Sequence, residues 1–258
     1  MTNRDIPRRR VSRWRCHAAP RRQRLAVALT ALAALALLLL PVDTPARDPL
    51  WDDLPWQERV GPDWFRINAA RGDARAQYRL ALLYERGVEV DRDLATAMKW
   101  YRRAGEQGHA RAQFKLASYY RQGRVEDADL AKARRWYAKA ADQGLARAQY
   151  NLGVLVERGI GEAPDPARAA ALYRKAAEQG VAAAHISLGL LYAAGTGVEE
   201  DPVAALAHLI RAAQAEVPGA DQARRQVARG LGQADRKAAA ARAAELAPGT
   251  PRPPAVGE

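Results

Sequence analysis

Four stretches of this chain repeat one another at a spacing of 36 residues, without insertion or deletion. The segment Ala-Gln-Tyr, or a close variant of it, begins at Ala76, Ala112, Ala148 and Ala184. Glycines recur at the same step at Gly72, Gly108, Gly144 and Gly180, and again at Gly87, Gly123, Gly159 and Gly195. A period of this length is typical of a solenoid, in which each unit buries its apolar face only against its neighbours.

Each unit is expected to contain two helices, here called helix A and helix B. In the first unit, helix A is predicted over about residues 74–86, because Ala76, Leu80 and Tyr84 recur every fourth residue and share one face. Gly87 then ends this helix, as glycine does where the chain must turn left-handed.

An aspartate precedes helix B in every unit. These residues are Asp93, Asp129, Asp165 and Asp201. An aspartate at this position accepts hydrogen bonds from the free N–H groups of the first helical turn. In the third and fourth units the next residue is Pro166 or Pro202, which suits the first position of a helix. The four carboxylates are therefore interpreted as helix caps rather than as an acidic site.

The recurring large residues predict the core of the repeats. They are Leu80, Tyr84, Trp100, Tyr101, Leu116, Trp136, Tyr137, Leu152, Tyr173 and Leu188. Trp136 in particular is expected on the inward face of helix B, between two complete units. The fourth unit lacks the aromatic pair and has His208 and Leu209 instead, which predicts a thinner core at that end.

The pattern Ala-Gln-Tyr-x-Leu-x-x-x-Tyr-x-x-Gly, followed by Asp-x-x-x-Ala-x-x-Trp-Tyr-x-x-Ala, resembles the Sel-1-like repeat, a relative of the tetratricopeptide repeat. The match covers about residues 61–216, with departures at Arg124 in the second unit and Val156 in the third. The resemblance implies an all-α, right-handed solenoid that acts as a scaffold or adaptor in bacterial envelopes or signalling. It implies no catalytic residues.

The array is expected to extend beyond its four full units. Asp63-Trp64-Phe65 lies 36 residues before Lys99-Trp100-Tyr101, which predicts a leading half repeat. Residues 217–247 are rich in alanine and arginine, which predicts polar capping helices of the kind that solenoids need for solubility. Residues 248–258 are rich in proline and glycine and are expected to be disordered.

The N-terminal region suggests a membrane anchor. Residues 1–24 contain nine arginines and one aspartate, so this arm contributes +8 of the total formal charge of +12. Residues 25–42 contain an apolar run from Leu25 to Leu40, interrupted only by Thr30. A positive flank before an apolar run places the N-terminus in the cytoplasm. We expect a single-pass signal anchor in a bacterial inner membrane, with a basic cytoplasmic arm and periplasmic repeats.

A cleaved signal peptide is the alternative, because the apolar run is shorter than a full spanning helix. Proline and aspartate crowd the candidate cleavage site at Ala46, which favours the anchor; both interpretations place the repeats outside the cytoplasm. Residues 43–60 then form a linker, in which Trp51 and Trp56 either mark the membrane interface or pack on the first helix. A basic arm also suits nucleic acid, but the adjoining apolar run favours the membrane, and no nucleic-acid partner is expected.

Nothing in the sequence points to catalysis. It contains no phosphate-cradling glycine loop, zinc-binding His-Glu motif or nucleophile elbow. His185 and His208 replace the Gln and Trp of the repeat, so the repeat frame explains them better than a metal site does. We therefore expect no enzymatic activity, no metal and no cofactor.

A basic stripe along helix A is the candidate site. In the first unit, Arg75, Arg79, Leu82 and Arg86 are spaced so that they share one face of the helix. With the equivalent positions of the next units, the predicted partner-binding cations are Arg75, Arg79, Arg86, Arg111, Lys115, Arg147 and Arg158. In tetratricopeptide-like arrays helix A lines the concave side, so the groove is expected to be basic near its N-terminal end. The alternative is a solvated basic surface without a ligand.

Two binding functions remain open at this point. The first is a membrane-anchored periplasmic scaffold that binds an extended peptide or an acidic protein segment in the concave groove. The second is a protein that binds an anionic cell-envelope polymer or assists a cell-wall enzyme. An enzyme is the third hypothesis, and the lack of a catalytic constellation argues against it.

Overall fold

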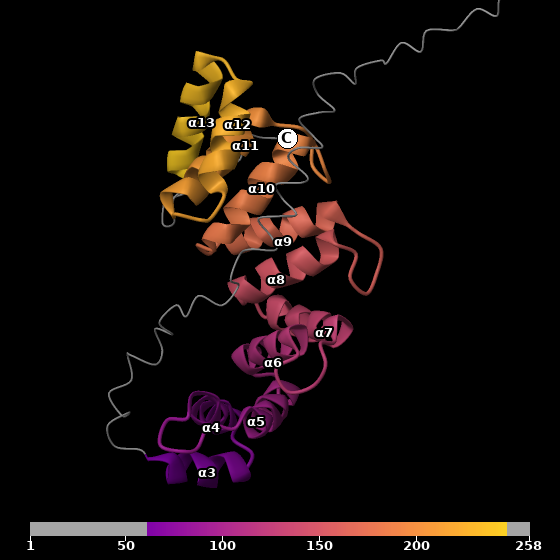
Figure 1. Cartoon of the computed structure of the whole chain (residues 1–258), viewed down its shortest axis with the longest axis vertical. Coiled ribbons are helices and arrows are strands. Elements are labelled where there is room, and N and C mark those ends of the chain that lie inside the picture. The colour runs from indigo at the N-terminus through magenta and orange to yellow at the C-terminus, as the bar shows by residue number, and fades with distance from the viewer. Residues whose placement is uncertain (1–60, 247–258) are drawn as a thin grey trace, which may run out of the picture.

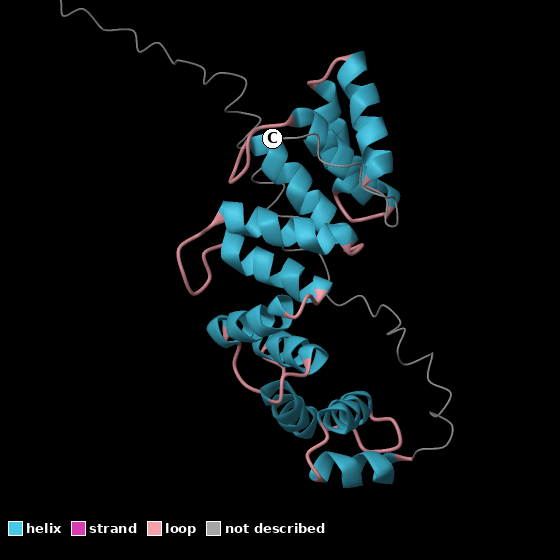
Figure 2. Ribbon diagram, turned by 180° about the vertical axis from the view of Figure 1, so that it is seen from behind, coloured by secondary structure: helices cyan, strands magenta, loops and turns pink. Residues whose placement is uncertain are grey.

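The structure, a computed structural model, describes residues 61–246. This part of the chain folds into eleven α-helices and contains no strand (Figure 2). The helices are α3 (Pro62–Ala70), α4 (Ala74–Arg86), α5 (Leu94–Glu106), α6 (Ala110–Gln122), α7 (Leu130–Asp142), α8 (Ala146–Glu157), α9 (Pro166–Glu178), α10 (Ala182–Ala194), α11 (Pro202–Gln214), α12 (Ala220–Arg229) and α13 (Gln233–Glu245).

The helices pair into hairpins that stack along the long axis of the molecule (Figure 1). Helices α4, α6, α8 and α10 are the A helices, and each packs against the B helix that follows it, α5, α7, α9 or α11. Each B helix also packs against the next A helix, so every hairpin contacts only its neighbours. The array is therefore an all-helical solenoid, as the 36-residue period predicts.

Side chains and glycines bound these helices. Asp93 accepts hydrogen bonds from the backbone N–H groups of Ala95 and Thr96, and the aspartates that precede α7, α9 and α11 each accept one from their first turn. At the other end of α4, Gly87 has a φ of 69°, which only glycine adopts at little cost. The long turn between α4 and α5 thus begins at a glycine and ends at an aspartate, Gly87 and Asp93, which suit these backbone conformations.

The core lies between the helices of each hairpin and between successive hairpins. Tyr101, Tyr137 and Tyr173 are fully buried at equivalent positions of α5, α7 and α9. The predicted core residues Leu80, Leu116, Leu152 and Leu188 are buried as well. Tyr84 and Trp100, by contrast, are only partly buried and lie at the edge of the core.

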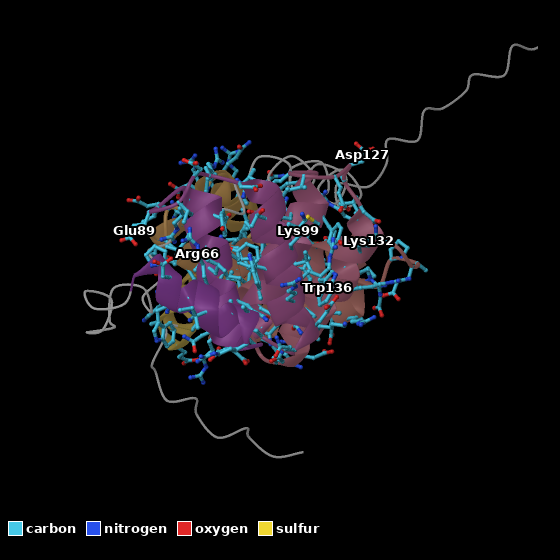
Figure 3. The ribbon with its side chains drawn as sticks, turned by 90° about the horizontal axis from the view of Figure 1, so that it is seen from below. Arg66, Glu89, Lys99, Asp127, Lys132 and Trp136 are labelled. Carbon is cyan, nitrogen blue, oxygen red and sulfur yellow. The ribbon has the colours of Figure 1, made fainter. Side chains whose placement is uncertain are left out.

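The expectation that Trp136 faces inward is wrong. Trp136 of α7 is only partly buried and packs at the edge of the core, where its ring lies against Gly105 of α5. Lys139 covers the ring, with its Nζ 4.3 Å from the ring centroid. Figure 3, a view along the solenoid, shows Trp136 and Lys132 on the same side of the molecule. Its neighbour Tyr137 occupies the inward position instead, because adjacent residues on a helix point about 100° apart.

A ladder of glutamines connects successive units, and the sequence analysis did not identify it. Buried Gln113 donates from Nε2 to the carbonyl of Gly105 at 2.9 Å, and its Oε1 accepts from Gln143 Nε2 at 2.8 Å. The same two bonds occur at Gln77 with Gln107 and at Gln149 with Gln179. The 36-residue recurrence of Gln107, Gln143 and Gln179 was the available signal.

The ends of the array differ from its middle. The leading helix α3 packs on α4, and its Trp64 and Ile67 are exposed. At the other end α12 and α13 both pack on α11, and Arg242 of α13 forms an ion pair with Asp201 at 2.9 Å. No helix between residues 61 and 246 is long and apolar enough to cross a membrane. The predicted basic arm, transmembrane helix, linker and tail lie outside the described residues.

Candidate partner-binding surface

The predicted stripe on helix A is not a continuous exposed band. Leu82 is 1% exposed and belongs to the core, although it was grouped with Arg75, Arg79 and Arg86. Ser118 occupies the same position in α6; it is also buried, and its Oγ lies 3.0 Å from the Tyr137 hydroxyl. This position faces helix B, so the predicted stripe is interrupted at its third residue in α4 and α6.

Three of the predicted cations lie near His109, the N-cap residue that precedes α6. His109 Nδ1 accepts a hydrogen bond from the backbone N–H of Ala112, and its ring stacks on Tyr78 with centroids 4.6 Å apart. Burial lowers the pKa of His109, and the charges of Arg111, Arg75 and Arg79 lower it further. The arginines of α4 and α6 therefore share one region of positive potential. We call Arg75, Arg79 and Arg111 the basic cluster.

Lys115 has a different role from the one predicted. Its Nζ lies 3.2 Å from Glu85 Oε2, and Arg124 Nη1 lies 3.1 Å from Glu85 Oε1. The Tyr101 hydroxyl donates to the same carboxylate at 2.5 Å. Burial raises the pKa of Glu85, but Lys115, Tyr101 and Arg124 together hold it below its usual value. Lys115 thus joins α6 to α4 within the fold, because it neutralises a carboxylate whose side chain is only 11% exposed.

The other predicted cations lie apart from the basic cluster. Arg86 is exposed at the last residue of α4, and exposed Arg158 follows α8. Arg147 lines a groove of about 500 Å³ between α8, the turn that precedes α10 and the turn that follows α11. Asn151 lines the same groove, and its Nδ2 is buried without a hydrogen-bond partner among the described residues. The helix-A side is therefore hollowed at the third and fourth units.

A buried histidine pair replaces the glutamine ladder in the fourth unit. His185 Nδ1 lies 2.9 Å from His208 Nδ1, and Tyr192 stacks on His208. Such a bond requires one ring to donate and the other to accept, so the accepting Nδ1 carries no proton. Burial lowers the pKa of His185 to about 4 and that of His208 to about 3. Among residues 61–246 no group of three or more histidine, cysteine, aspartate or glutamate side chains is placed to hold a metal ion.

Stacked hairpins, an internal hydrogen-bond ladder and capped ends define a helical repeat protein whose exposed surface, rather than a catalytic centre, carries the candidate site. The Sel1 repeat family model matches residues 74–109, 110–145, 146–181 and 182–217, which is more than half of the chain. The chain therefore belongs to the Sel1 repeat family. Members of this family are generally protein-interaction scaffolds without catalytic activity.

Solved structures of other repeat proteins resemble the chain, two of them at more than 30% identity. One is c5321 from uropathogenic Escherichia coli, a protective antigen with an SLR fold; it is 32% identical, with a TM-score of 0.64 over 84% of this chain and 45% of that one. The other is a Sel1 repeat protein from Oxalobacter formigenes, 36% identical, with a TM-score of 0.58 over 64% of this chain and 48% of that one. This chain thus spans about half the length of these structures. No curated protein matches it.

Proposed function

We propose that this protein is an interaction scaffold that binds an acidic protein segment through its basic cluster. The observation that carries the proposal is the convergence of Arg75, Arg79 and Arg111, from two successive A helices, around the start of α6. Guanidinium groups bind carboxylates with paired hydrogen bonds, and their planar, pre-organised geometry lowers the entropy lost per hydrogen bond. The groove that Arg147 lines extends the same side of the solenoid toward the fourth unit.

A charge-reversal experiment tests the basic cluster. The purified full chain is titrated with a labelled oligoglutamate peptide, and the Arg75→Glu/Arg79→Glu variant is compared with a control, Arg225→Glu/Arg229→Glu. The control changes the net charge equally on α12, far along the axis from α4 (Figure 1). The cluster variant should lose roughly tenfold or more in affinity, since each arginine–carboxylate pair at a protein surface contributes up to about 1 kcal/mol. Lys115 stays native, because reversing it would place two carboxylates together.

Salt provides the second measurement in this experiment. Screening acts over roughly 8 Å in physiological buffer, so binding of the acidic peptide should weaken as salt rises. Equal losses in the two reversed variants would show only a dependence on net charge and would reject the basic cluster as the site. Stronger binding to an anionic polysaccharide than to the acidic peptide would favour a cell-envelope polymer as the natural ligand.

The location of the scaffold is a separate part of the proposal. The arginine-rich arm followed by the apolar run at Leu25–Leu40 supports an inner-membrane anchor with periplasmic repeats. Alkaline phosphatase fused to the C-terminal end of this sequence should be active in a bacterial host, and removal of residues 1–42 should abolish that activity. An inactive fusion of the full sequence would reject the topology. A mature N-terminus at Arg47 would replace the anchor with a cleaved signal and leave export intact.

A further inference from the structure

Glu85 and Glu157 occupy equivalent positions of the first and third units, but only Glu85 has cations beside it in the next unit. Glu85 of α4 is followed, in steps of 36 residues, by Arg121, Glu157 and Ala193. The cations that contact Glu85 change at the same time: Lys115 becomes Asn151 and then Ser187, and Arg124 becomes Ile160 and then Thr196. At the second boundary an arginine meets neutral residues. At the third boundary the carboxylate returns and both cations are missing.

Glu157 therefore has the hydrogen bond of Glu85 but not its ion pairs. The buried Tyr173 hydroxyl donates to Glu157 Oε2 at 2.6 Å, as Tyr101 does to Glu85. Among the described residues Glu157 forms no ion pair. The one cation whose charge lowers its pKa is Arg158, which is exposed. Burial raises the pKa of Glu157, whereas Glu85 has a lowered pKa. The pKa values of the two carboxylates move in opposite directions because cations pair with Glu85 and not with Glu157.

Ser187 and Thr196 occupy, beside Glu157, the positions that Lys115 and Arg124 occupy beside Glu85. Ser187 is 5% exposed, and its Oγ has no hydrogen-bond partner within the described structure. The Ser187 hydroxyl lies close enough to the hydroxyls of Tyr150 and Tyr173 to lower their pKa values. It therefore lies beside the Tyr173 hydroxyl, which donates to Glu157. Thr196, at the position of Arg124, is exposed and several atoms shorter than arginine. The side chains that fill this space at the first boundary are therefore truncated at the third, on a side that solvent reaches.

We propose that Glu157, Tyr173 and Ser187 form a binding site for the ammonium or guanidinium group of a lysine or arginine in the bound protein segment. A carboxylate with one hydrogen bond and partial burial gains most from a cation that also donates hydrogen bonds. This inference rests on the proposed function and deepens it. The segment is acidic where it meets the basic cluster and carries a cation where it meets the third unit, so the scaffold fixes its direction.

An organic cation fits this site better than a metal ion does. The groups that satisfy Glu85 at the first boundary are an ammonium and a guanidinium, which bind a single carboxylate through hydrogen bonds. Hard metal ions need several oxygen ligands. Around Glu157 the described residues offer one carboxylate, and no group of three possible metal ligands occurs among them.

A peptide selection tests the site. A random peptide display library is selected on the full chain, on Glu157→Gln and on the Arg75→Glu/Arg79→Glu variant. The native chain should enrich peptides that combine acidic residues with a lysine or arginine. The Glu157→Gln variant should lose the enrichment of lysine and arginine alone and bind the selected peptides roughly tenfold more weakly, while replacement of their lysine by norleucine should have no further effect. The cluster variant should lose only the acidic enrichment.

The outcomes separate this inference from the proposed function. If lysine and arginine are enriched equally on Glu157→Gln, or are not enriched on the native chain, the cation site is overturned. Acidic enrichment on the native chain would still support the proposed function. Loss of acidic enrichment on the native chain, with enrichment of cations that depends on Glu157, rejects the proposed function and retains the site.

An internal lysine provides an independent measurement. Ser187→Lys restores the residue that Lys115 represents at the first boundary, so it should raise the midpoint of thermal unfolding and block selection of cationic peptides. In a double-mutant cycle the stabilisation should vanish in the Glu157→Gln background. Equal effects of Ser187→Lys in both backgrounds would show that no ammonium binds at Glu157 and would overturn the proposal.

Discussion

At the scale of single residues, side chains at equivalent positions of the repeat can have different roles. Glu85 and Glu157 occupy the same place on α4 and α8 and accept a bond from equivalent tyrosines. Their pKa values nevertheless move in opposite directions, because Lys115 and Arg124 surround only Glu85. The same frame places an internal cation, Lys115, in the row that was predicted to bind a partner.

Replacing each carboxylate by glutamine should have opposite effects on stability. Ionised Glu85 stabilises the fold at pH values above the unfolded pKa of about 4.5, and this contribution is lost as the pH falls through its lowered folded pKa. Glu85→Gln should therefore cost about 1–3 kcal/mol near neutral pH. Glu157 has a raised folded pKa, so the stability contributed by its protonated form is present below the unfolded pKa and is lost as the pH rises through the folded value. Glu157→Gln should raise the free energy of unfolding near neutral pH.

Urea unfolding of the two variants beside the native chain, at neutral and at acidic pH, measures both effects. The advantage of Glu157→Gln should shrink in acid, where the native carboxyl is protonated. Destabilisation by both replacements at neutral pH would mean that Glu157 is paired in solution.

At the scale of helices, periodicity predicted which segments are helical but not which neighbour each face meets. The period of 36 residues and the positions of glycine and aspartate located the helices from α4 to α11 closely, since caps and left-handed glycines act locally. The inward residue of helix B was less certain. Trp136 and Tyr137 are adjacent, both aromatic and both recurrent, and only the packing of α7 on its neighbours distinguishes them.

These two residues should differ in their contribution to stability. Tyr137 is fully buried, so Tyr137→Ala should cost about 3–5 kcal/mol, as expected for a large core side chain replaced by alanine. Trp136→Ala should cost less, about 1–2 kcal/mol, because solvent already reaches part of the ring and Lys139 covers it only from outside. Chemical denaturation of both variants provides the comparison. A larger loss for Trp136→Ala would return Trp136 to the core.

At the scale of the whole molecule, stability is distributed along the solenoid, because each hairpin contacts only its neighbours. Three boundaries carry the glutamine ladder, and the fourth unit instead has the His185–His208 pair. The sequence showed that these histidines depart from the repeat. It could not show that they bond to each other, since they lie 23 residues apart on two helices whose spacing only packing determines.

The histidine pair should make acid unfolding begin at the fourth unit. Burial lowers both pKa values, to about 4 and about 3, from an ordinary value near 6.5, so the unfolded chain binds more protons between these values. The stability that the neutral pair contributes is complete above about pH 6.5 and is lost as the pH falls through the folded values. Nearby charges are those of Arg174, Arg211 and Arg242, which oppose protonation, and of Asp201, which favours it.

Hydrogen exchange at neutral and acidic pH should detect this order. Acid should accelerate exchange first in α10 and α11, and next in α12 and α13, which pack on α11, while α4 and α5 remain protected. The variant His185→Gln/His208→Leu carries the residues of the third unit at these positions, Gln149 and Leu172, and should lose most of this sensitivity. If acid instead opens α4 and α5 first, or if the variant responds to pH as the native chain does, the weak point of the solenoid lies elsewhere.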